Sequence, residues 1–135
     1  MTIIIEWYCY EKNGRSCDRC NESRRAIQRA VERVSISLQE RGFGVELREH
    51  KLDDDRIDQS NMVIINGHDL VSLLKEREGI FSYCRSCTEI TGKPSECRTF
   101  IYRSRAYEGV PEDMVVEGIL LAAGLRPAVP PEHSR

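Results

Sequence analysis

Two cysteine pairs in this chain have a spacing that can do chemistry. Cys17 and Cys20 lie in "SCDRC", where a polar loop turns into a long amphipathic stretch, and Cys84 and Cys87 lie in "YCRSC". A Cys-x-x-Cys pair brings two thiols within disulfide reach, and it is also a common half of a thiolate zinc site. The spacing therefore indicates either thiol-disulfide exchange or the binding of a thiophilic metal.

The first pair stands where a helix is expected to begin. Dithiol exchange needs one nucleophilic thiolate and one resolving thiol. At a helix start, free backbone N–H groups and the positive end of the helix dipole favour a thiolate at Cys17, and Arg15 and Arg19 flank it. We expect Cys17 to be partly exposed with a lowered pKa and to form a reversible disulfide with Cys20. The alternatives are a metal-ligand pair and two small helix residues.

The second cluster consists of Cys84, Cys87 and Cys97. Three interpretations stay open: a site for zinc or another thiophilic metal, a second redox pair that relays electrons to the first, or a locally disulfide-bonded flap. No fourth metal ligand follows at the expected spacing. His68 is the nearest histidine but is typical of a polar turn residue, and Cys9, in an apolar strand, is typical of a small hydrophobic residue.

The composition restricts the class of protein. The chain has 135 residues, 40% of them hydrophobic, which fits one domain with its own core. A formal net charge of −2 gives no indication of nucleic acid or an anionic membrane as partner. No apolar run approaches the roughly 20 residues that span a bilayer. We therefore expect neither nucleic acid nor membrane as a partner, and the sequence leaves the oligomeric state open.

The beginning of the chain bears on its compartment. "MTIIIEWYCY" lacks the basic region and the small-residue cleavage site of a signal peptide, so we expect a cytoplasmic protein. Six cysteines in a reducing compartment favour metal binding or redox chemistry over permanent disulfides. A secreted disulfide framework is the competing interpretation.

The apolar pattern predicts the elements that must position these thiols. A long helix is expected at 18–41, because Ile27, Ala30, Val34 and Leu38 recur at helical spacing, with Arg25, Arg29 and Arg33 on its solvated face. Strands are predicted at 2–10, 44–52, 61–66 and 97–107, a short helix at 68–76 and a last helix from Pro111 to Gly124. Residues 77–97 look irregular.

This order predicts an α/β fold of the thioredoxin-like type, a βαβ unit followed by a ββα unit, with a Cys-rich insertion between the third and fourth strands. Residues 1–125 would form the domain, including the insertion 77–97, and residues 126–135 a flexible tail. We expect the insertion to lie outside the core sheet, to have few regular hydrogen bonds, and to depend on its cysteines for order, since it has few large apolar side chains.

Three motifs carry a resemblance to a known family. "SCDRC" after the first strand, then "SNMVIING" and "CRTFIY", resemble the thioredoxin and glutaredoxin superfamily, and more narrowly a family of uncharacterised prokaryotic thioredoxin-like proteins, over residues 3–125. The resemblance implies a dithiol in which Cys17 attacks and Cys20 resolves, acting on a protein or small-molecule disulfide or thiol.

The chain departs from the superfamily at one position. The superfamily carries a cis-proline before its third strand, which helps to position a substrate chain and keeps metals away from the dithiol, whereas this chain has Ser60-Asn61 there. The first hypothesis is therefore a thiol-disulfide oxidoreductase-like protein that uses Cys17 and Cys20 and needs no cofactor. The alternative is a module that binds or handles a thiophilic metal, zinc at Cys84, Cys87 and Cys97, on a thioredoxin-like scaffold.

Overall fold

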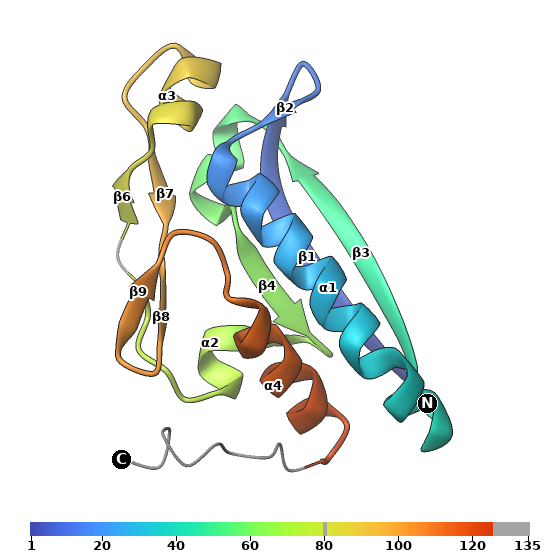
Figure 1. The fold of residues 1–135 in the computed structure, drawn as a ribbon. Coiled ribbons are helices and arrows are strands. Elements are labelled where there is room, and N and C mark those ends of the chain that lie inside the picture. Colours follow the sequence, from blue (N-terminus) through green and yellow to red (C-terminus); the bar gives the residue numbers. More distant parts are fainter. Residues whose placement is uncertain (80, 126–135) are drawn as a thin grey trace.

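Strand β1 (Thr2–Lys12) is the centre of the main sheet. Its alternate side chains Ile3, Ile5, Trp7 and Cys9 are all buried, as expected of a strand with one face against the core. The structure is a computed structural model that describes residues 1–79 and 81–125 (Figure 1). It is a mixed α/β protein whose strands form one larger sheet and two small antiparallel ones.

The main sheet is built around β1. Strand β3 (Gly44–Leu52) pairs with β1 in parallel over its whole length, and β4 (Met62–Ile65) pairs with β1 on the other side, antiparallel. The short strand β5 (His68–Asp69) continues the sheet beyond β4, and β2 (Arg15–Ser16) folds back on the end of β1. A 3-10 helix, η1 (Asp54–Gln59), connects β3 to β4.

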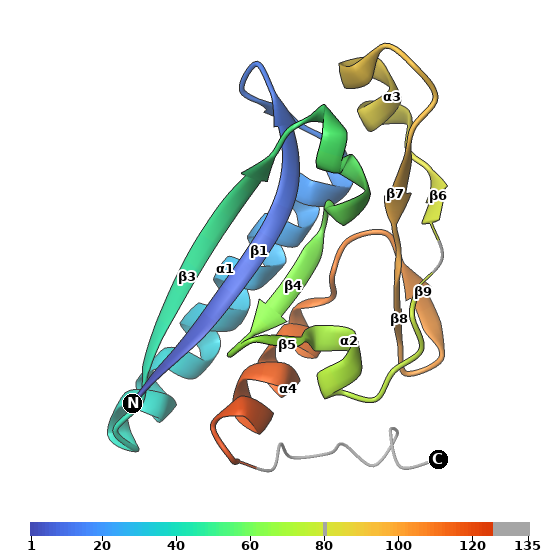
Figure 2. The same ribbon diagram turned by 180° about the vertical axis from the view of Figure 1, so that it is seen from behind.

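Two helices cover one face of this sheet. Helix α1 (Asp18–Glu40) connects β1 to the parallel strand β3, and α4 (Glu112–Ala122) packs beside it (Figure 1). Seen from behind, the strands lie in front of both helices (Figure 2). Helix α2 (Leu70–Leu73) touches α4 where Gly118 leaves no room for a side chain: a Cβ there would lie 2.4 Å from Leu70 Cδ1.

The Cys-rich segment folds apart from the main sheet. Strand β6 (Phe81–Tyr83) pairs with β7 (Glu96–Arg98), and helix α3 (Arg85–Thr91) lies between them in the sequence. We call residues 81–98 the flap. It lies beside the N-terminal end of α1, far from the chain's N-terminus (Figures 1 and 2). A second hairpin follows, β8 (Phe100–Tyr102) with β9 (Arg105–Tyr107).

Most of the predicted elements are present. The helix expected at 18–41 is α1, the strand expected at 44–52 is β3, and the crossover between parallel strands is as predicted. Within the described residues, no helix is long and apolar enough to cross a membrane. The tail predicted at 126–135 lies outside the described residues.

Two predictions about the second half of the chain are wrong. Residues 97–107 do not form a fourth strand of the main sheet: the chain reverses at Arg103 and Ser104, which have positive φ, so β8 pairs with β9, while β5 takes the place beside β4. The segment 77–97 lies outside the core sheet as expected but is not irregular, because β6, α3 and β7 supply regular hydrogen bonds.

Candidate metal centre

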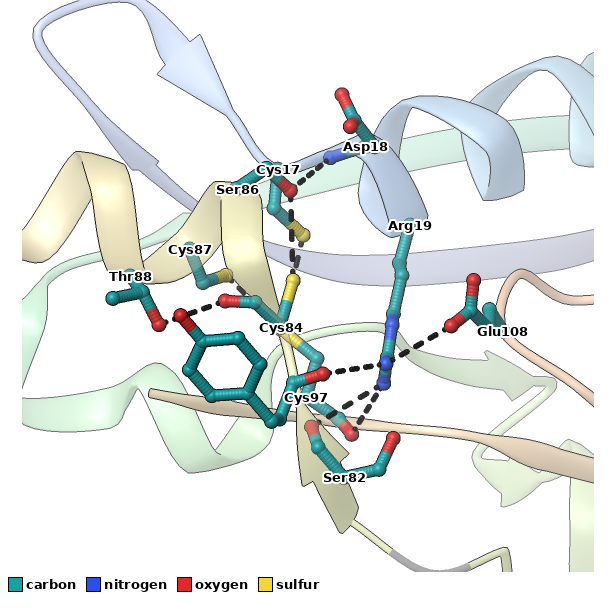
Figure 3. A network of polar contacts seen from close by, with 11 residues as sticks. Cys17, Asp18, Arg19, Ser82, Cys84, Ser86, Cys87, Thr88, Cys97 and Glu108 are labelled. Carbon is teal, nitrogen blue, oxygen red and sulfur yellow. Dashed lines mark hydrogen bonds and ion pairs between the residues drawn. The ribbon is translucent and has the colours of Figure 1, made fainter. Parts of the chain in front are cut away.

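Four cysteines converge where the flap meets the start of α1. The Sγ atoms of Cys17, Cys84, Cys87 and Cys97 all lie within 4.8 Å of one another, and all four side chains are buried. Figure 3 shows Cys17 arriving from α1 and the other three from the flap. This cluster, called the thiol tetrad below, unites one cysteine of the first Cys-x-x-Cys pair with all three of the second cluster.

The local secondary structure positions each of the four thiols. Cys17 is the N-cap residue of α1, in an extended conformation with φ −73° and ψ 165°, and its side chain makes no capping hydrogen bond to the first turn. Cys84 is the N-cap of α3, and Cys87 lies in that helix. Cys97 lies opposite Ser82 in the antiparallel pair of β6 and β7, and β7 contacts α3.

The sulfur positions approach those around a tetrahedral metal ion. With Zn–S bonds of about 2.3 Å, a regular ZnS4 tetrahedron has S–S edges of about 3.8 Å. Cys17 Sγ and Cys97 Sγ lie 3.8 Å apart, which matches such an edge, whereas Cys87 Sγ and Cys97 Sγ lie 3.0 Å apart and would have to separate around an ion. The donor set, four soft sulfurs shielded from water, is the one that zinc and other thiophilic ions prefer.

The pKa values of the four thiols are shifted in different directions. Hydrogen bonds from Cys20 first, and then from the other three thiols of the tetrad, lower the pKa of Cys17. The Cys17 thiolate in turn raises the pKa of Cys87 and of Cys97. It also raises the pKa of Cys84, but hydrogen bonds from Cys87 and Cys97 outweigh this effect and bring the value to about 6. Negative charge is thus favoured at Cys17 and Cys84 and disfavoured at Cys87 and Cys97.

A buried arginine joins the flap to α1. Arg19 is only 6% exposed, and its guanidinium donates hydrogen bonds to the backbone carbonyls of Cys97 and Tyr83, both at 2.9 Å. It also forms an ion pair with Glu108 at 3.2 Å. Figure 3 shows the guanidinium reaching across to the flap strands. Arg19 therefore positions the backbone just before Cys84 and at Cys97.

A second contact holds α3 against α1. The backbone N–H of Asp18 donates to Ser86 Oγ at 2.8 Å, which satisfies one of the free donors at the start of α1 (Figure 3). A cavity of about 220 Å³ opens beside this contact and reaches Cys84. Its lining comprises Asp18, Arg19, Tyr83, Cys84, Arg85, Ser86 and Glu108. Cys84 is thus the member of the tetrad that borders a cavity.

Cys20, the partner of Cys17 in the first pair, is not a member of the tetrad. Its Sγ lies 3.1 Å from Ser60 Oγ at the end of η1, and hydrogen bonding with Cys17 and Cys9, together with burial, raises its pKa. Cys9 interacts with Cys20, Ser16 and Arg24, and its pKa is lowered to about 7, mainly by the hydrogen bond from Cys20. Within the described residues, all six cysteines are therefore buried and unbridged.

The structure corrects part of the predicted site. Cys17 is fully buried rather than partly exposed. Arg19, expected to lower its pKa, is instead engaged by flap carbonyls and Glu108. Cys84, Cys87 and Cys97 do come together, as predicted. The missing fourth ligand is Cys17, which the sequence analysis had assigned to the other pair. The sequence did contain a signal for it: a cluster of three cysteines with no fourth ligand nearby implies a ligand from a distant segment.

Fold and site together define a class: a mixed α/β protein in which a buried cluster of four cysteines could hold a metal ion. Residues 3–119 match the family described as "Domain of unknown function (DUF2703)", and the chain belongs to this family. It is similar to an "Uncharacterized protein" of Archaeoglobus fulgidus, with 29% identity over 119 residues that cover 85% of this chain and 83% of the relative. No solved structure is detectably similar to the chain.

Proposed function

We propose that this protein binds one thiophilic metal ion, zinc, through Cys17, Cys84, Cys87 and Cys97. The observation that carries the proposal is the convergence of four buried sulfurs within 4.8 Å from two segments far apart in the sequence. Thiols that lie in one segment can meet by local chance, but Cys17 and the flap meet only through the tertiary fold. Four protein ligands make a closed site, typical of zinc that is held or handed on rather than of catalytic zinc, which keeps an open position.

Zinc suits this site because it prefers four soft ligands arranged as a tetrahedron, and the four thiolates would supply them. Binding requires the thiols to lose their protons, and the complex of one divalent ion with four thiolates carries two negative charges. The N-terminus of α1 at Cys17 and the guanidinium of Arg19 are placed to offset that charge. These residues would both orient the ligands and stabilise their charged form.

We propose further that the scaffold is thioredoxin-like. The parallel pair β1 and β3 joined by α1, with β4 antiparallel on the other side of β1, supports this assignment. So does the position of Ser60, which faces Cys20 from the end of η1, where the superfamily has its cis-proline. The fourth strand would then be β5, reduced to two residues.

Thiol-disulfide exchange by Cys17 and Cys20 is the second candidate function. One observation favours it: Cys17 caps α1, and Cys20 follows one turn later in the same helix. The substrate would be a protein or small-molecule disulfide or thiol. Both side chains are fully buried, so exchange would need the flap to move aside. The metal function needs no such opening to explain the geometry, and we prefer it for that reason.

Metal content tests the proposal most directly. Protein purified without chelator is expected to carry one zinc per chain by elemental analysis, and its cobalt-substituted form to absorb with the intense thiolate-to-metal bands of a four-sulfur site. Cys17→Ser and Cys97→Ser should each reduce zinc retention by at least a hundredfold. Cys9→Ser removes a thiol outside the tetrad and is the matched control.

The same variants separate the two candidates. If Cys17→Ser retains zinc as well as the parent, the four-cysteine site is refuted. If the parent carries no metal but reduces a model disulfide, and Cys17→Ser and Cys20→Ser abolish that reduction, the function is thiol exchange.

A further inference from the structure

The cavity between the flap and the start of α1 leads to the thiol tetrad. Its volume is about 220 Å³, and among the four cysteines of the tetrad only Cys84 lines it. The sulfur of Cys84 lies 3.5 Å from Ser86 Oγ, and Ser86 belongs to the same lining (Figure 3). A molecule in this cavity would therefore meet Cys84 before the other three ligands of the proposed zinc ion.

The lining combines buried and exposed residues. Arg19 and Cys84 are 6% and 3% exposed, whereas Tyr83 is 59% exposed and the side chain of Arg85 is 87% exposed. The exposed residues give solvent access to the cavity. Its volume is below the roughly 300–1,000 Å³ of cavities that hold drug-sized ligands, so its occupant must be about as small as a single amino acid.

The lining carries charges of both signs. Arg19 and Arg85 bring two guanidinium groups, and Asp18 and Glu108 bring two carboxylates. Arg19 pairs with Glu108 at 3.2 Å, and Arg85 pairs with Glu89 at 3.3 Å. The pair of Arg85 with Glu89 is exposed and therefore contributes little, so Arg85 can exchange this partner for another carboxylate. A ligand with one ammonium and one carboxylate group matches this lining better than a simple anion or cation.

We propose that the cavity binds a small zwitterionic thiol of the cysteine type, which exchanges with Cys84 as a zinc ligand. This inference rests on the zinc site proposed above and names the class of molecule through which zinc enters and leaves it. The carboxylate of the thiol pairs with Arg85, and its ammonium group pairs with Asp18 or Glu108, which leaves its sulfur beside Cys84.

The ligand exchange is balanced in protons and charge. The thiol gives up its proton and its sulfur bonds to zinc, while the bond between zinc and Cys84 Sγ breaks and that sulfur takes up a proton. The ion keeps four thiolate ligands, and the complex keeps two negative charges. Nothing is oxidised or reduced. The incoming ligand must be a thiol because a soft sulfur replaces a thiolate on zinc better than a hydroxyl does.

Transfer of zinc from the loaded protein to a chromogenic chelator tests the exchange. L-cysteine is expected to speed the transfer with saturation, and about tenfold more than 2-mercaptoethanol at equal thiolate concentration, because each ion pair with the lining adds a few-fold in affinity. Cysteamine and 3-mercaptopropionate, which each lack one of the two charges, should fall between them. A short pulse of an alkylating reagent during the transfer should modify Cys84 ahead of Cys17, Cys87 and Cys97.

Two variants of the flap locate the effect at the cavity. Arg85→Ala should raise the half-saturating concentration of cysteine by about fivefold, as expected for the loss of one exposed ion pair. Lys93→Ala removes an exposed cation of the flap that does not line the cavity, and it should respond to cysteine like the parent. The spontaneous release of zinc is measured for each variant, and the effect of cysteine is expressed relative to it.

The metal site and the ligand exchange can fail separately. A parent protein that holds no zinc refutes the metal site, and the exchange with it. If the parent holds zinc but cysteine speeds its release no more than 2-mercaptoethanol does, the metal site stands and the exchange at the cavity is refuted. An unchanged half-saturating concentration in Arg85→Ala, or alkylation of another tetrad cysteine before Cys84, would also overturn the proposal.

Discussion

At the scale of single residues, Cys17 lies between two groups of thiols. On one side its sulfur is 3.8 Å from that of Cys97, and on the other Cys20, one turn further along α1, lowers its pKa. A metal ion at the tetrad would hold Cys17 as a thiolate ligand, and a disulfide with Cys20 would withdraw it. The two candidate functions therefore exclude each other at this one sulfur, which is why variants of Cys17 and Cys20 separate them.

Arg19 is the residue whose replacement should most affect the tetrad without removing a ligand. Arg19→Ala leaves the carbonyls of Tyr83 and Cys97 without their buried donor, which costs about 1–3 kcal/mol. Because the lost hydrogen bonds hold the flap, we expect zinc affinity to fall by about tenfold or more, measured by competition with a chromogenic chelator. Arg25→Ala, an exposed position on the same helix, is the control.

Lysine at position 19 gives a further check on this role. Lysine keeps the charge but loses the planar fork that reaches two carbonyls and Glu108 at once. Arg19→Lys should therefore restore only part of the affinity. Equal affinity in Arg19→Ala and the parent would mean that the tetrad, not Arg19, holds the flap in place.

At the scale of elements, the flap depends on contacts with α1 at one end. Its outward side chains Phe81 and Tyr83 are 40% and 59% exposed, so burial alone contributes little to its order. Further constraints include the tetrad, Arg19 and the contact of Asp18 with Ser86. We infer that the flap is the least stable part of the fold once the thiols are removed.

Replacing Cys84 and Cys87 together by serine should therefore loosen the flap alone. We expect amide exchange in residues 81–98 to speed up by at least tenfold, whereas β1 and β4 keep their protection because they pair with each other. Cys9→Ser, outside the flap, should leave both regions unchanged. If exchange in the flap stays slow in the double variant, packing and not the thiols orders it.

Helices α1 and α4 are joined by an exposed cluster of charges. Arg29 and Arg33 each form an ion pair with Glu112, at 2.8 and 2.9 Å, and Arg33 also pairs with Asp113. The sequence analysis placed these arginines on a solvated helix face; they are half exposed, and they also reach the first turn of α4. The neighbouring arginines hold the pKa of Glu112 below its usual range.

This cluster predicts a small pH-dependent stability term. Since the folded-state pKa of Glu112 is lowered, its contribution is present above the unfolded-state pKa of about 4.3 and is lost as the pH falls through the folded-state value. Glu112→Gln should therefore lower the free energy of unfolding at pH 7 by up to about 1 kcal/mol, and the difference from the parent should shrink below about pH 4.

Urea unfolding at several pH values measures this difference. Glu32→Gln, at an exposed position of α1, is the control, and high salt should reduce the effect of Glu112→Gln. A difference that persists unchanged at low pH would assign the effect to packing rather than to charge.

At the scale of the whole molecule, a metal at the tetrad would link the flap to the main sheet through α1. An ion that binds only the folded protein adds RT ln(1 + [metal]/Kd), about 4 kcal/mol at a thousandfold excess over Kd. Removing zinc with a chelator should therefore lower the unfolding temperature, and adding zinc back, but not magnesium, should restore it. Trp7, buried in β1, is the only tryptophan and reports unfolding of the sheet by its fluorescence.

The pH dependence of this linkage has a defined sign. Zinc needs the thiolates, and protons compete with it, so zinc affinity and the stabilisation it gives should fall as the pH is lowered. Unfolding temperatures that are equal with and without chelator at pH 7 would contradict the metal site, whatever their value.

The sequence by itself determined the elements of the first half of this protein. The run of β-branched and aromatic residues in "IIIEWYCY" predicts a strand, and the helical spacing from Ile27 to Leu38 predicts an amphipathic helix. The helix start at Cys17 was also readable, because a polar loop ends there. These features are local, because the direction of each side chain along a single helix or strand determines which residues share its buried face.

The tertiary structure decided which thiols meet. Cys17 and Cys20 are one turn apart, yet their sulfurs divide between two groups, because Cys17 caps α1 and faces the flap while Cys20 faces Ser60 and β1. Arg19 and Asp18 hold the flap at that end of α1 through hydrogen bonds, while β8 pairs with β9 and not with the main sheet. The spacing of Cys84, Cys87 and Cys97 predicted that these three meet. That Cys17 joins them depends on how α1 packs against the flap, and contacts of this kind between distant segments are not visible in the spacing.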